Sequence, residues 1–175
     1  MRSLPTLAGL PARLNLFAGT LLLAALTACQ TPPAAPLARA SLQERQVAAL
    51  VRAGFRLTDG GWALDLDSRI LFDTDSDHLG ARSQATIARI AQTLIEADID
   101  KLSIEGHTDN TGGESYNLRL SQRRAEAVAR AIAEQGIPYA NIQQSGLGSA
   151  HPVADNSNEN GRAQNRRVAI IVPIS

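Results

Sequence analysis

From Phe55 to Val172 the apolar residues follow two periods in turn, and this alternation constrains the fold more than any other feature of the chain. Apolar residues at every second position are typical of strands, and apolar residues three or four positions apart are typical of amphipathic helices. Strand-like segments lie at 62–66, 102–104, 142–145 and 168–172, and helix-like segments lie at 87–95 and 118–135. The order predicts an α/β (α+β) domain, roughly βαβαββ, with a small mixed sheet and helices on one side.

The charge balance and the cysteine count exclude several classes of protein. The 175 residues include 17 basic and 17 acidic side chains, so the formal net charge is zero. A nucleic-acid binder usually needs a basic excess, and adsorption to an anionic membrane needs one too. The single cysteine allows neither an internal disulfide nor a thiolate zinc site. The length permits one ordinary domain, and we expect that domain to use no nucleic acid, metal or cofactor.

The start of the chain has the layout of a secretory leader. Arg2 and Arg13 precede an uncharged apolar run at 14–26, which is too short for a permanent membrane span. The run ends in Leu-Thr-Ala-Cys, which resembles a bacterial lipobox. This resemblance implies a signal peptide at 1–28, an acylated N-terminus at Cys29, and 147 remaining residues (175 − 28). Gln30 then favours anchoring in the outer membrane, facing the periplasm; the alternative is an ordinary leader with Cys29 as an incidental thiol.

A tether and a short helix are expected between the anchor and the domain. Residues 29–40 form a Pro- and Ala-rich stretch, which predicts an extended tether. Ser41 and Glu44 fit a capping box that opens a helix over 41–54, and Gly54 is a natural stop. A helix this short needs a packing partner, which is the main domain at 55–175, a second copy of the chain, or another protein.

A long polar motif follows the second predicted strand. The sequence runs through the segments 104–112, 116–117, 120–125, 146–148 and 161–168, which read IEGHTDNTG, YN, LSQRRA, GLG and GRAQNRRV. In this order and spacing the chain resembles the OmpA-like peptidoglycan-binding domain, over about Leu64 to Val172. The resemblance implies the fold of that domain and a role in holding peptidoglycan through diaminopimelate of the stem peptide.

Two opposite charges are the expected ligand contacts. The free end of diaminopimelate carries an ammonium and a carboxylate on one carbon, so a site for it needs one anion and one cation close together. The resemblance assigns these roles to Asp109 and Arg124, and a guanidinium pairs well with a carboxylate. It also implies that further residues line the same pocket or its rim: Thr108, Asn117, Leu118, Phe72 and Asp73.

Each polar residue also has a plainer interpretation. Asp109 can simply cap a turn with Asn110, and Arg124 can be a solvated surface charge. We expect His107 to hydrogen-bond within its loop rather than to ligate a metal, because no third ligand follows at metal spacing. Three arginines either pair with carboxylates such as Glu105 or contact glycan: Arg162, Arg166 and Arg167. The segment 154–161 reads as an exposed turn rather than a calcium loop.

Three functions remain open at this point. One is a structural tether between outer membrane and cell wall. Another is a regulator, because the leader, the 54–62 segment and the C-terminal strand resemble the lipoprotein of a three-part system that controls cyclic di-GMP. In that system the lipoprotein sequesters a periplasmic repressor of a diguanylate cyclase, and the helix before the domain would hold the switch. A wall-cleaving enzyme is disfavoured, because no nucleophile with a positioned base is visible; homodimerisation is left open.

Overall fold

The computed structural model describes residues 35–73 and 76–174. The predicted signal peptide at 1–28, the acylated Cys29 and the first part of the predicted tether lie outside the described residues. Side chains are described from residue 43 onward. No helix within these ranges is both long and apolar enough to cross a membrane.

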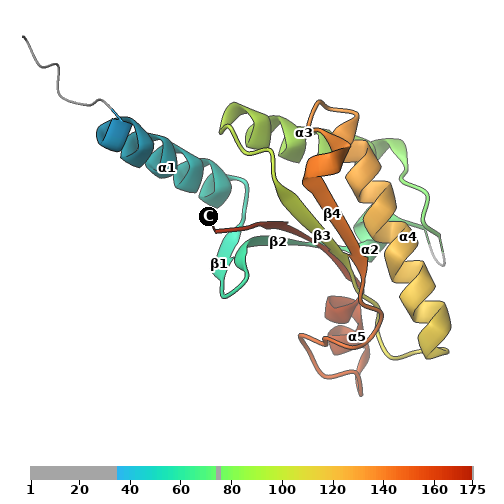
Figure 1. Ribbon diagram of the computed structural model, residues 1–175. Coiled ribbons are helices and arrows are strands. Elements are labelled where there is room, and N and C mark those ends of the chain that lie inside the picture. Colours follow the sequence, from blue (N-terminus) through green and yellow to red (C-terminus); the bar gives the residue numbers. More distant parts are fainter. Residues whose placement is uncertain (1–34, 74–75, 175) are drawn as a thin grey trace, which may run out of the picture. The chain divides into compact units, whose positions relative to one another are not determined.

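Five strands form one mixed sheet in the order β1-β2-β5-β3-β4 (Figure 1). The strands are β1 (Arg56–Thr58), β2 (Gly61–Asp67), β3 (Leu102–Gly106), β4 (Ile142–Gly146) and β5 (Arg167–Val172). Only the β3–β4 pair is parallel, and the other three pairs are antiparallel. The last strand therefore lies in the middle of the sheet, between β2 and β3. The predicted mixed sheet is confirmed, and β1 is an additional short edge strand.

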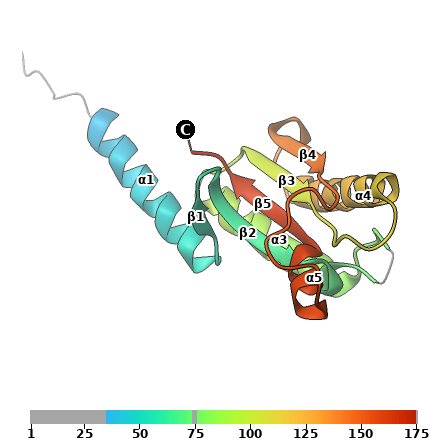
Figure 2. The same cartoon turned by 90° about the horizontal axis from the view of Figure 1, so that it is seen from below.

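The helices are α1 (Ala35–Arg52), α2 (Ser68–Leu71), α3 (Ala81–Glu96), α4 (Glu114–Ala133) and α5 (Glu159–Asn165). A single 3-10 turn, Tyr139–Asn141, precedes β4. Leu102 and Ile104 of β3 are buried against the apolar sides of α3 and α4, whereas Ser103 and Glu105 on the other face are partly exposed. Figure 2 shows the same sheet turned by 90°. The expected helices on one face of the sheet are confirmed.

The core is built from branched aliphatic side chains, as the alternating pattern requires. Ile104 and Ile170 of the sheet are fully buried with Leu94 of α3 and Ile132 of α4. α4 approaches the sheet so closely that a Cβ on Gly106 would lie 2.0 Å from the carbonyl oxygen of Ser121. Because Gly106 at the end of β3 has no side chain, α4 can pack this closely against the sheet, beside the loop that follows β3.

Three local predictions are corrected by the structure. The first helix begins at Ala35 rather than at Ser41, so it takes in part of the predicted tether. Pro36 does not prevent this start, because the N–H groups of a first turn lack intrahelical acceptors in any case. The segment 154–161 is a mostly exposed turn over 154–158, as expected, but its last three residues form the start of α5, which Asn158 caps by accepting from the backbone N–H of Gly161 at 2.9 Å. The fourth helix begins at Glu114, four residues before the predicted start at Leu118.

Candidate ligand-binding site

Asp109 lies in the loop between β3 and α4, and the backbone before it is tied to two neighbouring segments. The N–H of His107 donates to the carbonyl of Arg167 at 2.9 Å, and the N–H of Thr108 donates to the carbonyl of Gly148 at 2.9 Å. Asp109 itself is buried, with 7% of its surface exposed. The loop therefore holds a carboxylate at the end of the sheet in a fixed position.

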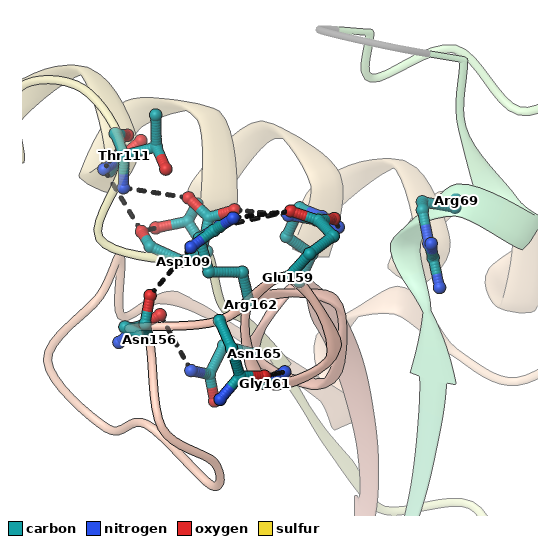
Figure 3. Close-up of polar contacts among 12 residues, drawn as sticks. Arg69, Asp109, Thr111, Asn156, Glu159, Gly161, Arg162 and Asn165 are labelled. Atoms are coloured by element: carbon teal, nitrogen blue, oxygen red, sulfur yellow. Dashed lines mark hydrogen bonds and ion pairs between the residues drawn. The ribbon is translucent and has the colours of Figure 1, made fainter.

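The Asp109 carboxylate is already engaged on both oxygens. Oδ1 accepts from the N–H of Thr111 at 2.9 Å, and Oδ2 accepts from Nη1 of Arg166 at 2.6 Å (Figure 3). Burial raises the pKa of Asp109, but the hydrogen bonds from Arg166 and Thr111 outweigh burial and bring the pKa below its ordinary value. The group is thus ionised at neutral pH. It does cap its own turn, through Thr111 rather than Asn110, and it pairs with a cation at the same time.

Two of the predicted pocket residues hold this loop in shape. The hydroxyl of Thr108 donates to the Asp109 carbonyl at 2.8 Å. The side-chain amide of Asn117, in the first turns of α4, donates to the carbonyls of Thr111 at 2.9 Å and of Asp109 at 3.4 Å. Thr108 and Asn117 are both buried. The structure therefore gathers Thr108, Asp109 and Asn117 into one group.

Arg124 belongs to a second group, which lies further along α4. Its side chain is buried, its Nε donates to the carbonyl of Ser76 at 3.0 Å, and its guanidinium carbon lies 5.2 Å from the ring centroid of Phe72. The interpretation as a solvated surface charge is therefore wrong for Arg124. It fits Arg123 instead, which is exposed and pairs with Asp77 at 2.8 Å.

One face of α4 connects the two groups. Asn117, Ser121 and Arg124 are buried on this face, and residues 117 and 124 are two turns apart, or about 10 Å along the axis. The remaining predicted residues lie nearer the surface. Leu118 is half exposed and lines a shallow hollow with Gln122, and Asp73 is exposed.

Sequence reasoning did not identify Arg166 as the partner of Asp109. Its second nitrogen, Nη2, donates to Oε1 of Glu159 at 2.5 Å, and the other carboxylate oxygen of Glu159 lies 3.0 Å from Arg162. Four alternating charges therefore run from Asp109 to Arg162 (Figure 3). The hydrogen bonds from Arg166 and then from Arg162 lower the pKa of Glu159.

The sequence left open whether Arg162, Arg166 and Arg167 pair with carboxylates or contact glycan. In the structure each of the three pairs with a carboxylate. Nε of Arg167 lies 3.0 Å from Oδ1 of Asp65, and Arg162 and Arg166 both form ion pairs with Glu159. Glu105, the example considered from the sequence, is instead the acidic neighbour of His107.

His107 differs from its sequence-based expectation. The residue is 2% exposed, and both ring nitrogens lack a hydrogen-bond partner among the described residues. Its Nε2 lies 3.7 Å from Oε2 of Glu105, which is too long for a hydrogen bond. The expected hydrogen bond within the loop is therefore wrong. Burial, and then the charges of Arg167 and His151, lower the pKa of His107 to about 4, so the ring is neutral at neutral pH.

No three potential ligands among His, Cys, Asp and Glu gather closely enough to hold a metal ion in the part of the chain that the structure describes.

Comparison with known proteins gives the site its context. The model of the OmpA family matches residues 71–166, which include both charge groups. The chain is 47% identical over 163 residues to the outer-membrane lipoprotein YfiB of Pseudomonas aeruginosa, covering 93% of this chain and 95% of the relative.

Solved structures agree with this assignment. The peptidoglycan-associated lipoprotein of Burkholderia pseudomallei superposes with a TM-score of 0.52 and 38% identity, covering 58% of this chain and 86% of that one. The cell wall anchor of the type VI secretion system of Pseudomonas aeruginosa superposes with a TM-score of 0.62 and 28% identity, covering 75% and 96%.

The chain belongs to the OmpA family. Its similarity to YfiB spans nearly the full length of both chains. On this basis the protein is a lipoprotein of the outer membrane whose folded domain faces the periplasm.

Proposed function

We propose that this protein binds peptidoglycan non-covalently through the free end of diaminopimelate in the stem peptide. The observation that carries the proposal is a pair of buried, oppositely charged side chains: Asp109 in the loop before α4, and Arg124 on the buried face of α4. Ionisable side chains are seldom buried, and buried ones gather at functional sites more often than elsewhere, so two of opposite charge near the end of a sheet are typical of a binding site. The names of the relatives support cell wall as the partner.

Each end of the ligand has a complementary group. The Asp109 carboxylate would accept from the ammonium, because its two oxygens hold about four acceptor sites and Thr111 and Arg166 use only part of them. The ligand carboxylate would pair with the Arg124 guanidinium, which the Phe72 ring supports from one side. Thr108 and Asn117 would keep the loop in its binding shape. Asp73 would form the rim, and Leu118 would contact the peptide on the surface of α4.

Binding to purified sacculi tests this proposal. Asp109→Ala or Arg124→Ala leaves one charge of the bound ligand without its partner, which costs a few kcal/mol and lowers affinity about 100-fold or more. Arg123→Ala is the matched control, because this neighbouring arginine makes only an exposed ion pair with Asp77. Wild type and Arg123→Ala should sediment with sacculi, and the two site variants should not. Retention of both site variants, with circular dichroism showing them folded, would remove the proposed site.

Anchoring through an acylated Cys29 is part of the same proposal. The lipobox-like sequence before Cys29 and the lipoprotein relatives support it. Several acyl chains on one residue give firm membrane attachment, since each buried methylene contributes about 0.8 kcal/mol. Growth with a tagged palmitate should label the wild type and leave Cys29→Ser unlabelled. An unlabelled wild type would contradict the anchor.

A second, compatible role is regulation: sequestering a YfiR-like periplasmic repressor of a diguanylate cyclase. The structural observation in its favour is the slight attachment of α1. Among its described side chains only Ala49 and Leu50 are buried, and a cavity of about 540 Å³ is lined by Val47 and Leu50 on one side and by Trp62 on the other. A helix that buries so few of its described side chains can be released toward a partner at small cost. The likeness to YfiB supports this role, and a purely structural tether is the alternative.

Affinity purification of the mature domain from periplasm separates these two roles. A regulator should retain a repressor protein, and deletion of residues 37–53 should abolish that interaction. If the repressor still co-purifies after the deletion, its contact lies outside α1. A purely structural tether would retain no repressor. Light scattering of the mature domain would show in the same preparation whether it forms a homodimer. We propose binding alone, without catalysis, so incubation with muropeptides should yield no cleavage product.

A further inference from the structure

We propose that Glu159 is a positioning residue that sets how strongly Asp109 attracts the ligand's ammonium. It would act through Arg166, without touching the ligand. This inference rests on the proposed diaminopimelate site, because it concerns the anion of that site.

The geometry places Arg166 between two carboxylates. One nitrogen of its guanidinium lies 2.6 Å from Asp109 and the other lies 2.5 Å from Glu159. The side chains of Asp109 and Arg166 are largely buried, at 10% and 22% exposed, whereas Glu159 is 62% exposed. By these exposed fractions, Glu159 contacts Arg166 from the more exposed side and Asp109 from the more buried side; Figure 3 shows Asp109 and Glu159 in this cluster.

Arg166 has opposing consequences for a cationic ligand. Its hydrogen bond holds the Asp109 carboxylate ionised and in place, which favours binding. Its positive charge lies directly beside the position where the ammonium would contact the same carboxylate, which disfavours binding. The second carboxylate offsets this repulsion, because Glu159 neutralises Arg166 from the far side. The side chain of Glu159 is ionised at neutral pH, since Arg166 and Arg162 both stabilise its charged form.

The consequence is a graded dependence of affinity on the charge at position 159. Without the Glu159 carboxylate, the positive charge of Arg166 is compensated only by Asp109. The same Asp109 carboxylate is the group that would bind the ligand's ammonium. Exposed ion pairs have small energies, so we expect Glu159→Gln to weaken ligand binding about two- to fivefold, and Glu159→Lys to weaken it further.

The test is a titration of the mature protein with a soluble stem tetrapeptide that contains meso-diaminopimelate. The wild type is compared with Glu159→Gln and Glu159→Lys, and with the same two changes at Glu134. Glu134 is an exposed residue at the far end of α4 and serves as the matched control. Affinity should be highest for the wild type, lower for Glu159→Gln and lowest for Glu159→Lys, with both Glu134 variants equal to the wild type.

Salt separates an electrostatic role from a structural one. At 1 M salt the Debye length is about 3 Å, so the differences among the position-159 variants should shrink toward zero while all of them still bind. A loss that persists unchanged at 1 M salt would mean a distorted loop and would overturn the inference. Equal affinities of the Glu159 and Glu134 variants, with Asp109→Ala still abolishing binding, would also overturn it. Failure of the wild type itself to bind the tetrapeptide would instead contradict the proposed function.

Discussion

The Asp109 end of the domain and the attachment of α1 are built in opposite ways. Around Asp109, buried polar groups are fixed by directional hydrogen bonds with three segments, to which Thr111, Gly148 and Arg166 belong. α1 is attached through two buried apolar residues and a 3.4 Å hydrogen bond from Gln46 to the carbonyl of Asp98. Directional networks hold one geometry, whereas a small apolar contact can separate and re-form. This difference fits the two proposed roles, in which the Asp109 end holds a fixed ligand and α1 changes its partner.

The largest effect is expected where α4 touches the sheet. In Gly106→Ala the new Cβ would meet the backbone of Ser121, which cannot move without displacing the helix. We expect a loss of about 3 kcal/mol or more in the free energy of unfolding, together with loss of sacculus binding. Gly60→Ala is the control, because nothing lies within 4 Å of a Cβ there. Urea denaturation measures both, and equal midpoints would show that the close approach of α4 is not needed.

As the pH falls, protonation of His107 should lower the free energy of unfolding before Asp109 becomes protonated. His107 has a pKa of about 4 when folded and an ordinary value of 6.5 when unfolded, so between these pH values only the unfolded chain binds the proton. Stability should therefore fall as the pH falls from 6.5 to 4, by up to about 3 kcal/mol. The contribution of Asp109 is lost at lower pH, because its pKa is depressed below the ordinary aspartate value.

Urea denaturation at a series of pH values checks this window. His107→Gln should remove most of the slope between pH 6.5 and 4, and His78→Gln, at an exposed histidine that is not among the groups acting on His107, should keep it. An unchanged slope in His107→Gln would assign the acid sensitivity to other groups.

A change in α1 should act locally. Leu50→Ala removes a buried side chain and should cost about 2 kcal/mol, near the low end for such changes because the helix can shift. Amide hydrogen exchange should accelerate over residues 47–52 and stay unchanged in β3 and α4. Equal acceleration throughout the domain would mean that α1 is as integral to the fold as the Asp109 loop.

The smallest effect is expected at the exposed pair of Arg123 and Asp77. Both side chains are nearly half exposed, so Asp77→Asn should change the free energy of unfolding by less than about 0.5 kcal/mol. Sacculus binding should also be retained. A larger loss in either measurement would show that the 76–78 segment needs this pair to support Arg124.

The sequence predicted most of the sheet and the two long helices, because their apolar periods are strong. It could not predict β1 or α5, which are too short to show a period and depend on neighbours: β1 pairs only with β2, and α5 begins at the cap supplied by Asn158. The start of α1 was placed too late because Ser41 and Glu44 imitate a capping box inside a longer helix.

The candidate site was predicted in part for a similar reason. The family motif lies in one stretch of chain and indicated Asp109 and Arg124. The cation that pairs with Asp109 is 57 residues away, so no local pattern could single out Arg166 from its neighbours. The unpaired ring of His107 was also beyond prediction, since it depends on which strands meet at the end of the sheet.

The most direct test of the account is a crystal structure of the domain with the diaminopimelate tetrapeptide bound. The ligand's ammonium should lie within hydrogen-bond distance of the Asp109 carboxylate, and its carboxylate should pair with the Arg124 guanidinium. A peptide bound elsewhere, with Asp109 and Arg124 contacting only protein, would contradict it.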